Sequence, residues 1–145
     1  DSSAASDVYK RQKLNWTPDI IHLHGWFTSL FPLYIKKLYS DDPIFDRCKI
    51  ISSIYSKAFN GNLSKSLPKK IQFDGIQDDL SSISAPDYYS LTELMIQYSD
   101  SVILSSEKTE KEITALIKKN SRDCLSYKDS LSDEKLLDFL LKNLD

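Results

Sequence analysis

The sequence predicts an α/β fold in which about four short parallel strands carry helices on both faces. The first observation is three segments of strand length that are apolar or rich in β-branched residues, at 20–23, 49–55 and 102–104. The second is that segments with a helical spacing of apolar residues lie between and after these runs. Strands that alternate with helices form parallel sheets joined by right-handed crossovers. A ligand site is therefore expected at the carboxyl ends of the strands.

The first strand, 20–23, ends at Gly25 and is followed by a helix expected over 26–39. Pro32 lies near the first turn of this helix, where a missing N–H is tolerated. An Asp-Asp-Pro sequence at 41–43 is expected to stop the helix, because the residue before a proline avoids the helical conformation.

The second strand is expected over 49–55, where β-branched isoleucines lie between polar flanks. The segment 56–85 is rich in Ser, Lys, Asn and Asp and is expected to form a loop, whose length indicates either a function or local helical turns within it. Asp87 is a good N-cap for the helix that follows. The apolar residues of that helix fall on one face, namely Tyr88, Leu91, Met95 and Tyr98.

After the third strand at 102–104, the chain is expected to add a helix, a fourth strand and a final helix. Ser105 or Ser106 is the expected cap of the first helix, which turns Ile113, Leu116 and Ile117 inward. The fourth strand is expected over 124–127, and Ser132 is expected to cap the final helix. Core positions are expected for the leucines of that helix, namely Leu136, Leu137, Leu140 and Leu141.

Composition narrows the possible classes of function. The chain has 145 residues, enough for one domain or a piece of one, and its net charge of -2 gives no electrostatic reason to expect nucleic acid or an anionic membrane as a partner. The longest mostly apolar run, 26–35, is too short to span a bilayer. The only cysteines, Cys48 and Cys124, lie outside any zinc-type spacing, so no metal site is predicted and a reducing cytoplasm is expected.

The N-terminal residues are set apart from the rest of the chain. Residues 1–13 begin with Asp rather than Met and are small and polar, without apolar periodicity. They are expected to be a disordered or non-native leader. Residues 14–145 are expected to form one partial domain.

Three segments carry a resemblance to a known family. Residues 16–26 read W-T-P-D-I-I-H-L-H-G-W, which is similar to the W-x-P-D-hydrophobic-hydrophobic-H-x-H-D-W segment of the glycogen/starch synthase family. Residues 49–61 resemble its strand running into T-V-H-N-x-x-Y-Q-G, and residues 98–103 resemble its Y-A-D-x-hydrophobic-hydrophobic segment. The three occur in the family's order and cover roughly 14–113.

The resemblance implies the GT-B architecture, in which two Rossmann-like domains enclose the active site in the cleft between them. This chain looks like the second half of the N-terminal Rossmann-like domain, the starch synthase catalytic domain. Family members transfer glucose from ADP-glucose or UDP-glucose to the non-reducing end of an α-1,4-glucan. The expected partners are therefore an α-glucan and possibly a nucleotide sugar, most of whose contacts lie in the C-terminal domain; no cofactor is expected.

The departures from the family pattern weaken the expectation of catalysis. Gly25 stands where the family has the Asp of H-D-W, and Tyr55 stands where it has the His of V-H-N. Phe27 and Glu107 replace a His and a Pro. Losing a positioned polar group at a reacting centre commonly costs on the order of a hundredfold in rate. The chain alone is expected to be inactive, and the alternatives are a non-catalytic glucan-binding or regulatory paralogue, or a fragment of a full enzyme with divergent motifs.

No catalytic residue is assigned, and the substrate-facing candidates are His24, Gly25, Trp26 and Tyr55. His24, Gly25 and Tyr55 are expected to lie together at the carboxyl ends of adjacent strands, where Gly25→Asp with Tyr55→His would place two polar groups in one pocket. Each candidate also has a structural reading. His22 and His24 can pack and hydrogen-bond locally, Trp26 can be a packing aromatic, and His-x-His without a third ligand is a weak metal motif.

Overall fold

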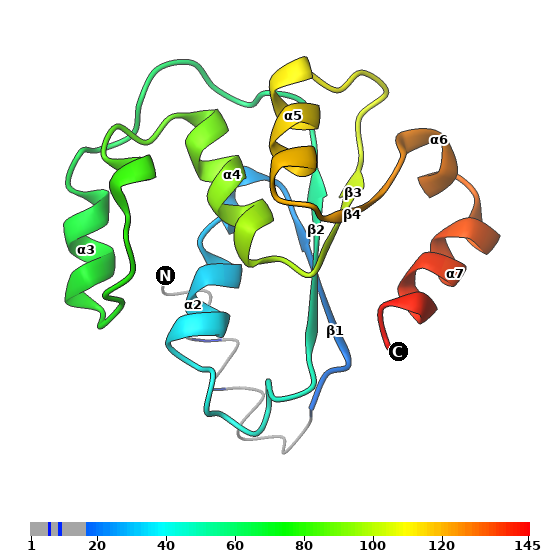
Figure 1. The fold of residues 1–145 in the computed structure, drawn as a ribbon, viewed down its shortest axis with the longest axis horizontal. Helices are drawn as coiled ribbons and strands as arrows, with labels where there is room; N and C mark the ends of the chain where they lie inside the picture. Colours follow the sequence, from blue (N-terminus) through cyan, green and yellow to red (C-terminus); the bar gives the residue numbers. More distant parts are fainter. Residues whose placement is uncertain (1–5, 7–8, 10–16) are drawn as a thin grey trace.

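The computed structural model describes residues 6, 9 and 17–145. Its centre is a parallel sheet with the strand order β1-β2-β3-β4 (Figure 1). The strands are β1 Ile20–His24, β2 Lys49–Ile54, β3 Ser101–Leu104 and β4 Asp123–Leu125. The expected α/β class with four short parallel strands is confirmed. Almost all of the expected leader, 1–13, lies outside the described residues.

Helices and 3-10 turns connect and cover the strands. They are η1 Trp26–Thr28, α2 Phe31–Lys37, α3 Leu67–Phe73, η2 Ser81–Ile83, α4 Tyr88–Tyr98, α5 Lys111–Lys119, α6 Tyr127–Ser130 and α7 Asp133–Lys142. Figure 1 shows α2, α4 and α5 on one face of the sheet and α7 on the other. Each strand pairs with the next one along the chain, so right-handed crossovers place every connecting helix on the same face. Among the described residues, the second face is covered by α7, which follows β4 and packs back on the sheet.

The side chains of β2 show how both faces are buried. Ile50 and Ile54 point to the face covered by α2, α4 and α5, where Ile54 packs in a cluster with Met95 and Ile113. Ile51 points the other way and packs with Phe139 of α7. All three isoleucines are at most 3% exposed, so β2 is buried on both faces, as expected of a strand inside a parallel sheet.

The expected helix over 26–39 is wrong in its extent, because the structure divides it into η1 and α2. Pro32 lies in the first turn of α2, as expected. Its ring has no N–H to donate to the carbonyl four residues earlier, so η1 cannot continue into α2 as one helix. The expected loop over 56–85 contains α3 and η2, and their residues Ile71 and Ile83 are buried against α4.

The expected capping of α5 by Ser105 or Ser106 is also wrong, because α5 begins at Lys111 with Glu110 as its N-cap. The Ser106 hydroxyl instead accepts from the Ser56 N–H at 2.8 Å, and the Glu110 carboxylate accepts from the Lys57 N–H at 2.8 Å. These two bonds hold the segment after β2 to the segment after β3. Both segments belong to the sheet edge where the candidate site lies.

The C-terminal part departs from the prediction at two points. The fourth strand covers Asp123–Leu125 and is followed by the short helix α6, so the expected strand 124–127 is shifted. Leu137 and Leu141 are 55% and 50% exposed, which contradicts a core position for all the leucines of α7. Phe139 takes the buried place instead, because α7 packs on the sheet through one face only.

Candidate functional site

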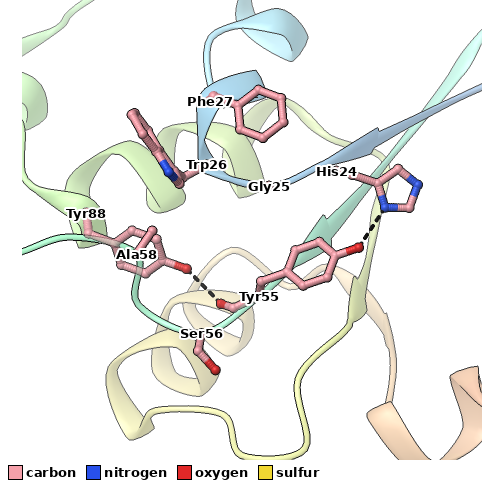
Figure 2. Close-up of a pocket in the computed structure, with 8 residues that line it drawn as sticks. All are labelled: His24, Gly25, Trp26, Phe27, Tyr55, Ser56, Ala58 and Tyr88. Atoms are coloured by element: carbon pink, nitrogen blue, oxygen red, sulfur yellow. Dashed lines mark hydrogen bonds between the residues drawn. The ribbon is translucent and has the colours of Figure 1, made fainter.

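A cavity of about 290 Å³ opens at the carboxyl ends of β1 and β2 (Figure 2). The eight residues that line it are His24, Gly25, Trp26, Phe27, Tyr55, Ser56, Ala58 and Tyr88. All four substrate-facing candidates from the sequence are in this set. Parallel strands present their carboxyl ends at one edge of the sheet, which is why the two short segments meet there.

The β1 and β2 sides of the cavity are joined by one side-chain hydrogen bond. Tyr55 follows β2 directly, and Figure 2 shows its ring reaching across to His24 at the end of β1. The Tyr55 hydroxyl lies 2.9 Å from His24 Nδ1. On the opposite side, the Tyr88 hydroxyl donates to the Tyr55 carbonyl at 2.7 Å. A phenol is protonated at neutral pH, and burial raises the pKa of Tyr88 further above its ordinary value.

Gly25 takes a backbone conformation that only glycine adopts readily. Its φ of 85° and ψ of 167° lie in a region that is almost closed to residues with a Cβ. A Cβ built there would lie 2.9 Å from Cε1 of Phe27. The Thr28 hydroxyl donates to the Gly25 carbonyl at 2.7 Å and fixes this turn. Gly25→Asp would therefore meet backbone strain and would require the Phe27 ring to move before it could add a polar group to the pocket.

Trp26 packs against other aromatic rings and also lines the cavity. A packing role and a position facing the cavity are therefore compatible for this side chain. Its ring centroid is 4.9 Å from that of Phe59, and Phe59 in turn packs edge-on against Tyr88 at 5.8 Å. Trp26 is still 36% exposed. Edge-to-face contacts of this kind hold aromatic rings in fixed orientations. The wall of the cavity is therefore an ordered aromatic surface.

His22 does not line the cavity. It packs and hydrogen-bonds with neighbouring residues of the sheet instead. Its Nε2 lies 2.6 Å from the Ser53 hydroxyl, and its ring centroid is 4.1 Å from that of His24. Desolvation of the ring, followed by the charge of His24, lowers the pKa of His22 to about 4. His22 is therefore neutral at pH 7.

The chemistry available at this site follows from the kinds of side chain that line it. Within the described part of the chain, the residues that line the cavity include no Lys, Arg, Asp or Glu. No group of three or more His, Cys, Asp or Glu residues able to hold a metal ion occurs among the described residues. Glu107, another departure from the family pattern, is exposed and is not among the lining residues. The cavity therefore offers aromatic faces, one imidazole and a few hydroxyls.

Sequence reasoning missed four lining residues: Phe27, Ser56, Ala58 and Tyr88. The sequence marks Phe27 only as a departure from the family pattern, and for Tyr88 the helical spacing favours a core position over stacking on a sugar ring. Tyr88 is indeed 3% exposed, yet its position in the first turn of α4 also brings it to the cavity wall. Phe59, next to Ala58 in the segment 49–61, packs on Tyr88 with ring centroids 5.8 Å apart, a contact that no local sequence pattern records.

None of the helices among the described residues combines the length and the apolar character needed to cross a membrane. The model of the family described as starch synthase catalytic domain matches residues 2–123. That match includes most of the residues set apart as a leader, and the leader assignment stays a prediction. No solved structure matches the chain.

Three curated relatives are also members of this family. Glycogen synthase of Clostridium perfringens is 34% identical over 103 residues, covering 70% of this chain and 21% of the relative. Glycogen synthase of Thermotoga maritima is 31% identical over 114 residues, which cover 77% of this chain and 22% of the relative. Glycogen synthase of Pseudothermotoga lettingae is 32% identical over 115 residues, which cover 77% of this chain and 23% of the relative. The chain thus spans about a fifth of the length of these relatives. The motifs, the sheet and the match over 2–123 together show that the chain belongs to the glycogen/starch synthase family, as part of its starch synthase catalytic domain.

Proposed function

We propose that this chain supplies one wall of the active-site cleft of a glucosyltransferase of the glycogen/starch synthase type. Such an enzyme would move glucose from ADP-glucose or UDP-glucose to an α-1,4-glucan, and we place it in the cytoplasm. His24, Gly25, Trp26 and Tyr55 would face the substrates, and the chain by itself would not catalyse transfer. The observation that carries the proposal is that segments matching two family motifs meet at one cavity, at the ligand-binding edge of the sheet.

One observation favours the alternative of a non-catalytic glucan-binding or regulatory paralogue. The cavity has an imidazole and a phenol bonded to each other where a transferase needs polar groups directed at a sugar. Gly25 adds no side chain, and its backbone conformation opposes replacement. A chain of this kind could keep a glucan in place without assisting the chemistry.

The first experiment assays the chain as it exists. The 145-residue chain is incubated with glycogen and radiolabelled ADP-glucose or UDP-glucose, with a boiled sample as control. We expect no label in glycogen above the control. Label above the control would overturn the proposal that this chain needs further protein for transfer.

The second experiment separates the two candidate functions. The matched 114-residue segment of Thermotoga maritima glycogen synthase is replaced by the corresponding segment of this chain. If the chain is a transferase wall, the chimera incorporates label, and Tyr55→His in the chimera raises the rate. A folded chimera that binds glycogen but gives no label, with or without Tyr55→His, identifies the paralogue and contradicts the transferase proposal.

A further inference from the structure

The mouth of the cavity exposes an unusual amount of aromatic surface for so small a region. Phe27 is 75% exposed, Tyr55 42% and Trp26 36%. Single exposed apolar side chains are normal, but a group of them around a cavity marks a binding surface. Figure 2 shows the Phe27 ring next to Gly25, on the opposite side of the cavity from Ser56.

Phe27 is held in this exposed place by its neighbours. Its ring contacts Trp26 edge-on, with centroids 6.5 Å apart and planes at 85°. It also lies over Gly25, where a Cβ would be 2.9 Å from its Cε1. Gly25 thus leaves the space that the ring occupies, and the two residues depend on each other.

The surroundings of the ring define the class of ligand. A nucleotide sugar carries a diphosphate, which proteins hold with Lys, Arg or helix N-terminal amides. In the described part of the chain no Lys or Arg lines this cavity, and Lys57, close by in sequence, has its ammonium 5.1 Å from the Tyr89 ring centroid. A pyranose ring is uncharged and has an apolar C–H face that packs on the negative face of an aromatic ring.

We propose that Phe27, supported by Trp26 and made possible by Gly25, is the specificity-determining residue of this cavity and binds the neutral face of a glucan unit rather than a nucleotide sugar. This inference rests on the proposed function, since it takes the cavity to be the substrate-facing one. The inference adds two points to that function. The Phe27 ring selects the uncharged substrate, and position 25 must remain glycine so that the ring can keep its place.

The test is an NMR titration of the whole 145-residue chain with maltoheptaose, ADP-glucose and UDP-glucose in separate series. We expect maltoheptaose to shift the resonances of residues around the cavity and to bind more tightly than either nucleotide sugar. Phe27→Ala is expected to raise the Kd for maltoheptaose about five-fold, and Phe27→Tyr to restore it. Phe73→Ala is the matched control, because Phe73 is 92% exposed on α3, away from the cavity lining, and its loss should leave the Kd unchanged.

Gly25→Ala tests the dependence between the two residues. It should raise the Kd about as much as Phe27→Ala, and the double variant should be no worse than either, because both changes remove the same ring from its place. Thermal melts and the dispersion of amide resonances show that each variant folds. The inference is overturned if maltoheptaose does not bind, if Phe27→Ala binds it normally, if the two substitutions act additively, or if a nucleotide sugar binds more tightly. These outcomes are independent of label transfer by the chimera, so the two proposals can fail separately.

Discussion

At the scale of single residues, the chain departs from ordinary preferences at a few defined positions, and each has an identifiable neighbour. Gly25 adopts its conformation beneath the Phe27 ring, and Ser121 has a positive φ of 53° although it is not glycine. His22 has its pKa lowered by desolvation and by His24. Such effects depend on contacts between distant residues or on backbone angles. The sequence alone therefore predicts four of the residues that meet at the cavity but not how they are oriented.

Ser121 provides a prediction about stability. It follows α5 in the left-handed conformation, with its N–H bonded to the Lys118 carbonyl and the Arg122 N–H bonded to the Ile117 carbonyl. This is the hydrogen-bond pattern of a Schellman C-cap, where glycine is preferred. Ser121→Gly should raise the free energy of unfolding by about 1 kcal/mol in urea titrations. A loss of stability would show that Ser121 is not strained in this position.

His22 provides a prediction about pH. The unfolded imidazole takes up a proton near its ordinary pKa of 6.5, whereas the folded one stays neutral down to about 4. Folding is therefore disfavoured as the pH falls from 6.5 to 4, by at most about 1.4 kcal/mol per pH unit and by less where solvent screens the ring. His22→Gln should lose this part of the pH dependence. A constant difference in unfolding free energy between the two proteins from pH 7 to 4 would contradict the assignment.

At the scale of elements, strands and helices were predicted well where one local pattern determined them. The three main strands were found from apolar runs, and α4 from the Asp87 cap and its apolar face. Failures occurred where a side chain with good local propensity had a distant partner instead. Ser106 caps no helix because it binds the Ser56 N–H, a contact between residues fifty positions apart. No local pattern in the sequence records such a contact.

The cap of α4 can be tested directly. Asp87 accepts from the Ser90 N–H at 2.7 Å, and the Ser90 hydroxyl accepts from the Asp87 N–H at 3.0 Å, which is a reciprocal capping box. Asp87→Ala should lower the free energy of unfolding by about 1 kcal/mol. Ser66→Ala is the matched control, since Ser66 precedes α3 without a side-chain cap bond. Equal losses in chemical denaturation for both variants would show that the Asp87 cap contributes nothing specific.

At the scale of the whole molecule, the family and the sheet followed from ordered motifs, but the role of α7 did not. The family match ends at residue 123, and α7 lies beyond it. The helix nevertheless buries Phe139 against Ile51 and Ile103 on the second face of the sheet. A repeating leucine pattern suggested a more fully buried helix, because a sequence does not show how many neighbours a terminal helix has.

The contribution of α7 to the core is measurable. Phe139 is 9% exposed, and Phe139→Ala should lower the free energy of unfolding by about 3 kcal/mol through lost burial and a new cavity. Phe73→Ala removes the same ring from a 92% exposed site and should change stability by less than about 0.5 kcal/mol. Similar small effects for both, measured by urea titration, would mean that α7 does not share the core of the sheet.

The position of α7 has a consequence during synthesis. Because β1 to β4 step in one direction, the helices that emerge with them all cover the same face. Among the described residues, the opposite face, with Ile51 and Ile103, receives its helical cover from α7, which leaves the ribosome after all four strands. A nascent chain stalled before Asp133 would therefore expose the apolar side chains on this face of the sheet to solvent. Exposed apolar surface of this kind favours aggregation until α7 docks on the strands.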